Sequence, residues 1–118
     1  MRDVASFPAV YLYRDVVDFR KAIDGLAGVV SEVMKQDVFS GALFVFCSRR
    51  RNKIKVLYWD RTGYCLWYKR LEEEKFVWPR KHDQAVIGVD VQTFRFFLDG
   101  IDVWKMKRHR ALEYQTAS

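Results

Sequence analysis

The fold is decided by residues 53–71, KIKVLYWDRTGYCLWYKRL, in which two strand-like runs flank a short turn. Apolar and aromatic residues dominate both runs, and the turn Arg61-Thr62-Gly63 carries glycine where hairpin loops often need a left-handed backbone. We therefore predict a β-hairpin of 53–60 and 64–71 with a three-residue loop. Pairing Asp60 with Tyr64 sets the register and places Lys55 opposite Lys69.

Both faces of this hairpin are largely apolar. In the predicted register one face carries Lys55, Leu57, Trp59, Cys65, Trp67 and Lys69, and the other carries Ile54, Val56, Tyr58, Leu66, Tyr68 and Arg70. A single helix covers only one face of a sheet. The second face therefore needs another layer, from this chain or from a second subunit.

The flanking sequence predicts the remaining elements. Apolar residues at helical spacing from Val16 to Met34, with Asp15 as the N-cap, predict one long amphipathic helix packed on one face of the sheet. Short strands are expected at 10–13, 42–47, 76–78 and 85–89. Asp90 is expected to cap a short C-terminal helix that ends before Gly100.

These elements define an α+β fold, an antiparallel sheet with a central β-hairpin. The chain has 118 residues and no repeats or linker-like segments, so we predict one domain over residues 1–104. Residues 105–118 are basic and then polar, and are expected to form a flexible tail.

Positive charge is concentrated in one part of the sequence. Residues 49–81 hold 11 Lys and Arg against 4 Asp and Glu, whereas residues 1–48 hold 5 against 6 and residues 82–118 hold 5 against 5. A localised cationic surface on a stiff hairpin suits a polyanion such as DNA. The predicted nucleic-acid-binding residues are Arg49, Arg50, Arg51, Lys53, Lys55, Lys69, Arg70, Arg80 and Lys81.

The same charges have a second interpretation, in which they only keep a sheet edge soluble and prevent aggregation. The aromatic residues of this region also allow two interpretations. They could stack on single-stranded bases, but aromatic residues at alternating positions are more often part of a core or an interface. The residues concerned are Trp59, Trp67, Tyr68, Phe76 and Trp78.

No catalytic or metal-binding pattern stands out. Cys47, Cys65, His82 and His109 lack the paired spacing of zinc ligands, and no cofactor is predicted. Asp60 is the one carboxylate placed as in a metal-dependent nuclease, but it is better interpreted as opening the turn. The two cysteines lie in predicted strands, as reduced thiols of a cytoplasmic protein would, although a disulfide would form if the strands were neighbours. No stretch is long and apolar enough for a membrane helix.

Several of these segments together resemble a known family, over about residues 10–102. The segments are Asp18–Lys21, Asp24–Leu26, Phe39–Gly41, Leu43–Phe46, Arg49–Arg51, Lys53–Asp60, Gly63, Lys69–Glu72 and Phe76–Pro79. They are similar to the TnpB-type accessory protein encoded by the second open reading frame of the sixty-six family of bacterial insertion sequences. The run from Arg49 to Pro79 is the specific part of the match.

The resemblance implies a bacterial protein of transposition that acts beside a separate, larger transposase. The family has no established catalytic residues, so none are assigned and the chain is not expected to be an enzyme. We expect a non-catalytic accessory protein that binds insertion-sequence DNA through the basic hairpin and helps to assemble the transposition complex. The alternative is a protein–protein adaptor that docks the transposase, or a second copy of itself, without contacting DNA.

Overall fold

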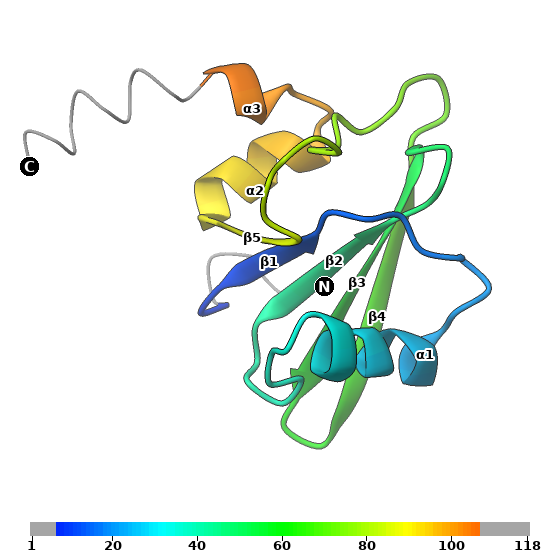
Figure 1. Ribbon diagram of the computed structural model, residues 1–118, viewed down its shortest axis with the longest axis vertical. Helices are drawn as coiled ribbons and strands as arrows, with labels where there is room; N and C mark the ends of the chain where they lie inside the picture. The colour runs from blue at the N-terminus through cyan, green and yellow to red at the C-terminus, as the bar shows by residue number, and fades with distance from the viewer. Residues whose placement is uncertain (1–6, 107–118) are drawn as a thin grey trace, which may run out of the picture.

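A five-stranded mixed sheet forms the centre of the computed structural model, which describes residues 7–106 (Figure 1). The strands are β1 (Val10–Tyr13), β2 (Leu43–Cys47), β3 (Lys53–Asp60), β4 (Gly63–Arg70) and β5 (Val86–Val89). Their order is β4-β3-β2-β1-β5, and β1 and β2 are parallel while the other pairs are antiparallel. The α+β class is confirmed. The sheet is mixed rather than antiparallel, and the β3–β4 hairpin lies at one end of it rather than at its centre.

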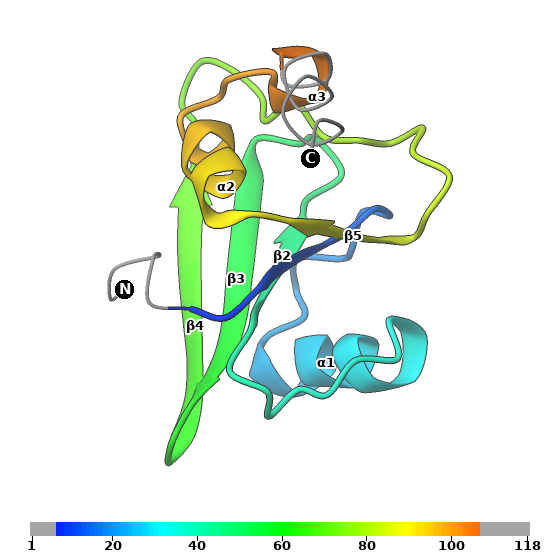
Figure 2. The same cartoon turned by 90° about the vertical axis from the view of Figure 1, so that its left-hand side faces the viewer.

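Each face of the sheet is covered by helices of this chain. All five residues of β2 are buried, as expected for a strand covered on both sides. Phe44 and Phe46 pack toward α1 (Ile23–Gly28), whereas Val45 and Cys47 belong to the core beneath α2 (Val91–Leu98) and α3 (Val103–Met106). Figure 2 shows α1 and α2 on different sides of the strands.

The layer on the α2 side is supplied by this chain and needs no second subunit. The ring of Phe97 lies 5.3 Å from that of Phe76 and 5.5 Å from that of Trp78. Phe76–Trp78 was expected as a strand, but it has no regular structure; the Phe76 amide instead donates to the Arg51 carbonyl (2.7 Å). The segment packs through its aromatic side chains and not through a strand ladder.

The short C-terminal helix α2 begins and ends as predicted. The Asp90 carboxylate accepts a hydrogen bond from the Thr93 amide (2.7 Å), which satisfies one of the amides left open in a first helical turn. Beyond the helix, Gly100 adopts a φ of +83°, the left-handed geometry that glycine allows at a helix end.

The predicted long helix is much shorter in the structure. α1 begins at Ile23 and continues directly into the π-helix η2 (Val29–Val33), so the expected start at Val16 with Asp15 as the N-cap is wrong. Residues 16–21 form an irregular segment, here called the arm. The Val17 amide donates to the Cys47 carbonyl (3.0 Å), and the Lys55 ammonium binds carbonyls of the arm. These long-range partners replace the hydrogen bonds of a helix.

The hairpin register differs by one residue from the prediction. Asp60 pairs with Gly63, so the loop has two residues, Arg61 and Thr62, and Arg61 rather than Gly63 has the left-handed backbone, with φ of +52°. Lys55 therefore lies opposite Tyr68, and the predicted like-charge pair with Lys69 does not form. A one-residue slip moves every β4 side chain to the other face of the sheet.

The cysteines and the helices bear on two further predictions. Cys47 and Cys65 are both free, because β3 separates the strands that carry them. None of the helices within residues 7–106 is long and apolar enough to cross a membrane.

The single domain over residues 1–104 remains a prediction. Most of the predicted tail 105–118 lies outside the described residues, although Lys105 belongs to α3.

Candidate nucleic-acid interface

The turn between β2 and β3 holds the densest group of predicted site residues. Ser48 is buried and organises this turn: its amide donates to the Lys53 carbonyl (3.1 Å), its carbonyl accepts from the Arg51 amide (3.0 Å), and its hydroxyl accepts from the Lys53 amide (3.3 Å). Arg51 completes the turn with a φ of +62°. Arg49 and Arg50 are exposed, so a hydrogen-bonded turn presents them to solvent.

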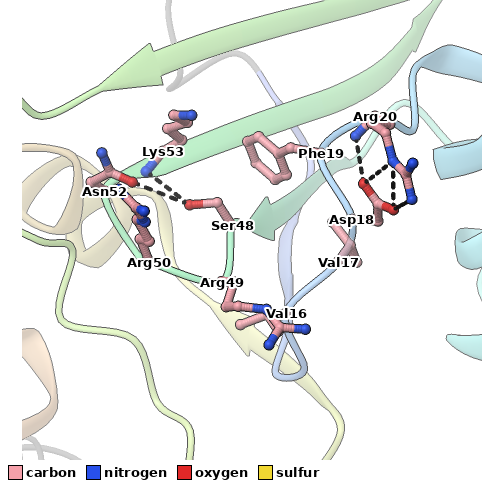
Figure 3. Close-up of a pocket in the computed structure, with 10 residues that line it drawn as sticks. All are labelled: Val16, Val17, Asp18, Phe19, Arg20, Ser48, Arg49, Arg50, Asn52 and Lys53. Carbon is pink, nitrogen blue, oxygen red and sulfur yellow. Dashed lines mark hydrogen bonds and ion pairs between the residues drawn. The ribbon is translucent and has the colours of Figure 1, made fainter.

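The arm lies opposite this turn, and together they enclose a cleft. Figure 3 shows Val16–Arg20 on one side and Ser48–Lys53 on the other. The cleft has a volume of about 530 Å³. Its lining residues are Val16, Val17, Asp18, Phe19, Arg20, Ser48, Arg49, Arg50, Asn52 and Lys53. This set contains four cations and one carboxylate, so the formal charge of the lining is +3.

The one carboxylate of the cleft is paired with an arginine of the same arm. Asp18 accepts hydrogen bonds from the Arg20 Nη2 (2.6 Å), Nε (2.9 Å) and backbone amide (2.9 Å). These bonds lower the pKa of Asp18 to about 2, with side-chain hydrogen bonding from Arg20 as the largest cause. The carboxylate is therefore charged at neutral pH but matched by its neighbour.

The remaining cations of the cleft have no such partner. Within residues 7–106, the side chains of Arg49, Arg50 and Lys53 make no hydrogen bond and no ion pair. Unpaired, exposed guanidinium groups can donate to both oxygens of a phosphate. The cleft is therefore suited to an anion with several oxygen acceptors.

Two predicted site residues on the hairpin, Lys55 and Lys69, form hydrogen bonds to backbone carbonyls of the chain. The Lys55 Nζ donates to the carbonyls of Phe19 (2.9 Å) and Lys21 (2.8 Å), and burial lowers its pKa. The Lys69 Nζ donates to the Leu98 carbonyl (2.9 Å) at the end of α2, on the other face of the sheet. Neither ammonium group joins the unpaired cations of the cleft.

The other predicted residues are dispersed. Arg70 pairs with Glu72 at 2.9 Å, and Arg51 contributes mainly through its backbone. Arg80 and Lys81 line a separate cavity of about 360 Å³, which also includes Trp104. The structure thus gathers three of the nine predicted residues, Arg49, Arg50 and Lys53, into one cleft.

Arg20 joins this cleft although the sequence analysis did not assign it. The helical periodicity placed Arg20 on a long helix, remote from the 49–53 turn. No pattern within the sequence reveals the contact, since it depends on residues more than 25 positions apart. The only signal is that Asp18–Lys21 is among the segments that carry the family resemblance, and this says nothing about its position.

Most of the candidate stacking aromatics are buried or in contact with other aromatic rings. Phe76 and Trp78 lie in the core, and Trp67 packs against it. Trp59 belongs to a cluster near the hairpin tip, where its ring lies 5.0 Å from that of Phe39 and 5.0 Å from that of Tyr64. Tyr68 is 49% exposed. Its ring lies 6.4 Å from that of Phe19, which lines the basic cleft.

The chain is thus a small α+β scaffold with a basic cleft, and residues 7–106 contain no cluster of three or more potential metal ligands. Comparison with known proteins identifies the family. A family model described as IS66 Orf2 like protein matches residues 8–108, and the chain belongs to this family. This confirms the resemblance seen in the sequence.

Two relatives come from Sinorhizobium fredii (strain NBRC 101917 / NGR234). The chain is 34% identical to the uncharacterized protein y4jC over 92 residues, which is 78% of each chain. It is 36% identical to the uncharacterized protein y4hO over 96 residues, covering 81% of this chain and 82% of the relative. No solved structure matches the chain. The family therefore links the chain to insertion sequences.

Proposed function

We propose that this chain is a non-catalytic accessory protein of insertion-sequence transposition that binds the phosphate backbone of DNA through the basic cleft. Membership of the IS66 Orf2-like family supports the setting. The observation that carries the DNA contact is the presence of unpaired Arg49, Arg50 and Lys53 side chains on a hydrogen-bonded turn. Bound to the ends of the element, the protein would help the separate transposase to assemble there.

The experiment is a salt titration of DNA binding. Fluorescence anisotropy is measured with labelled terminal repeats of the element and with a random duplex, for the wild type and for Arg49→Ala/Arg50→Ala. The plot of log K against log salt concentration has a negative slope, and each lost phosphate contact makes this slope less steep by about 0.9. The double variant is therefore expected to show a slope less steep by about two. Stronger binding to the terminal repeats would indicate sequence preference, whereas equal binding would indicate contact with the backbone alone.

A matched control removes two positive charges elsewhere. Lys35 follows the end of η2 and Arg61 lies at the hairpin tip, and both have positive φ values, 58° and 52°. Alanine, like the residues it replaces, carries a Cβ, so Lys35→Ala/Arg61→Ala changes the charge with little change in backbone strain. We expect this control to bind DNA almost as well as the wild type. Binding by the wild type that ignores salt would contradict the proposal.

A second candidate function, a protein–protein adaptor, is favoured by the aromatic cluster at the hairpin tip. Phe39 is 58% exposed and contacts Trp59 and Tyr64, at the end of the hairpin remote from the basic turn. Exposed apolar clusters often mark protein contacts. Light scattering of the chain alone and mixed with the transposase tests this function. A monomer that forms no complex would rule it out, and loss of a complex in Phe39→Ser would support it.

A further inference from the structure

We infer that Tyr68, supported by the ring of Phe19, is a stacking platform for the unpaired bases of single-stranded DNA. The phosphates of the strand bind Arg49, Arg50 and Lys53 in the cleft, while a base stacks on the exposed ring beside it. This inference rests on the proposed DNA contact. It adds an aromatic contact to that function and specifies the state of the DNA that the surface takes.

The first support is the position of Tyr68 on the sheet. Tyr68 belongs to β4, the strand at one end of the sheet, and lies directly opposite Lys55 of β3. Residues opposite each other in an antiparallel pair point to the same face, and so do residues two positions apart along a strand. Tyr68 therefore shares a face of the hairpin with Lys53, which lines the cleft. Because Tyr68 is 49% exposed, a ligand bound at that cation can reach its side chain.

The second support is the orientation of Phe19. Figure 3 shows its ring extending from the arm into the cleft, toward Ser48 and Lys53. The centre of this ring lies 6.4 Å from that of Tyr68, and the two ring planes are tilted by 56°. The two rings are thus neighbours, and they connect the cleft to the exposed part of β4.

The third support is that the fold holds Phe19 in place. The Lys55 Nζ donates to the Phe19 carbonyl (2.9 Å) and lies over the Phe19 ring, 4.8 Å from its centre. Two residues earlier, the Val17 amide donates to the Cys47 carbonyl (3.0 Å). A ring that is fixed before the ligand arrives loses little conformational freedom on binding. Because an ammonium group lies over Phe19, the more exposed Tyr68 offers the open ring for a base, and Phe19 supports it.

The fourth support is the match between these groups and the chemistry of a single strand. Bases in a duplex are stacked on each other, so a protein ring reaches the face of a base only after that base leaves the stack. Proteins that bind single strands combine cations for the phosphates with aromatic rings for the bases. Within residues 7–106, the three cleft cations without an ion-pair partner supply the first contact, and Tyr68 supplies the second. The ligand class is therefore single-stranded DNA.

The experiment compares three labelled probes by fluorescence anisotropy: one strand of a terminal repeat, the duplex of the same sequence, and a strand of the same length in which abasic sites replace the nucleosides. The abasic strand keeps the phosphates and lacks the bases. Stacking of one base on an aromatic ring strengthens binding by about fivefold or more. Tyr68→Ala is therefore expected to weaken binding to the normal strand by about fivefold or more. Its binding to the abasic strand and to the duplex is expected to stay unchanged.

Three control variants separate stacking from charge and from the loss of any exposed ring. Tyr68→Phe keeps the ring and is expected to bind the normal strand almost as tightly as the wild type. Phe39→Ala removes another exposed ring, at the hairpin tip, and is expected to have no effect. Tyr68→Ala removes no charge, so the slope of log K against log salt concentration stays the same, whereas Arg49→Ala/Arg50→Ala makes it less steep. Thermal unfolding of each variant verifies that it is folded.

The outcomes separate this inference from the proposed function. If the wild type binds none of the probes, or binds them independently of salt, the proposed function fails. If the wild type binds with the expected salt dependence and Tyr68→Ala holds the normal strand as tightly, only the inference fails. Equal losses of Tyr68→Ala on the normal and the abasic strand would also overturn stacking, since the abasic strand has no base to stack. Phe19→Leu keeps the apolar bulk without the ring, and unchanged affinity for the normal strand in this variant would overturn the supporting role of Phe19.

Discussion

The two sides of the sheet differ in how completely they are covered, and this difference separates the scaffold from the binding surface. On the α2 side, the buried cluster within the described residues has 15 members and includes the packed rings of Phe76, Phe94 and Phe97. On the α1 side the buried cluster has 8 members, and Val33, Phe39 and Tyr68 remain exposed. The cleft opens on the α1 side, where the arm takes the place of the first turns of the predicted helix.

We expect the α2 side to supply most of the stability and the α1 side most of the surface available to a ligand. A buried aromatic cluster contributes through the apolar area that it removes from water. An incompletely covered face leaves polar groups and cations available for a ligand. The following predictions test this division, from the largest expected effect to the smallest.

The largest effect is expected from truncating the ring at the centre of the α2 side. Phe97 is 1% exposed, so Phe97→Ala removes a large buried side chain and leaves a cavity. We expect a loss of about 3–5 kcal/mol in the free energy of unfolding, measured by urea denaturation. The control Phe39→Ala, at an exposed position on the α1 side, should cost less than about 1 kcal/mol. Equal losses would contradict the division between the two sides.

A pH-dependent effect is expected from Cys47, which faces the α2 side. Burial raises the pKa of its thiol from 9.0 to about 12, against smaller lowering effects from Arg51 and a backbone hydrogen bond. In the unfolded chain the thiol ionises near pH 9, while in the folded chain it stays protonated. Its contribution to stability is therefore complete below pH 9 and is lost as the pH rises toward 12.

This loss is measured by urea denaturation at pH 8 to 10.5 in a Cys65→Ala background, with and without Cys47→Ala. The chain that retains Cys47 is expected to lose about 1 kcal/mol more per pH unit above 9 than the chain that lacks it. Titration of lysines and tyrosines is common to both proteins and cancels. Parallel pH profiles for the two proteins would show that Cys47 is accessible to water.

A smaller effect is expected from the helix cap on the α2 side. Asp90→Ala removes the carboxylate that accepts from the Thr93 amide, which leaves that amide without its cap. The expected cost is about 1 kcal/mol in urea denaturation. Asp90→Asn, which keeps the acceptor, should lose much less, and an equal loss for both variants would show that charge rather than capping matters.

The smallest effect is expected on the α1 side, and in the opposite direction. The N-cap of α1 is Ala22, which provides no side-chain hydrogen bond. Because Ala22 already has extended backbone angles, Ala22→Ser can cap the helix and should raise the free energy of unfolding by about 0.5–1 kcal/mol. Ala22→Val, which cannot cap, serves as the control. A stabilisation common to both variants would point to a cause other than capping.

The elements that could be predicted are those set by neighbours in sequence. The alternation within Lys53–Asp60 indicated a strand, and Asp90 followed by an amphipathic segment indicated a capped helix; both are present. The hairpin was identified, but its register was wrong by one residue, since Gly63 suggested a three-residue loop. The chain places Arg61 in the left-handed conformation instead, a choice that turn preferences did not favour.

The sequence predicted which cations are candidates for the site, but not which of them lie together in the structure. Charge counting identified Arg49, Arg50 and Lys53, which share the cleft, but also Lys55 and Lys69, whose ammonium groups bind backbone carbonyls. A sequence pattern does not distinguish a lysine whose ammonium group is exposed to solvent from one whose ammonium group donates to a backbone carbonyl. The outcome for each lysine depends on which segment of the chain packs next to its side chain.

The amino-acid sequence by itself determined the family, the concentration of positive charge and the strand–turn–strand unit, because these depend on residue identity and on contacts between near neighbours. Only the tertiary structure decided that residues 16–21 leave the helix and meet the basic turn. The bond that holds them joins Lys55 to a carbonyl 36 positions earlier. Local periodicity favoured a helix there, but a half-buried ammonium group that binds two backbone carbonyls outweighs the small preference of a few residues for helical geometry.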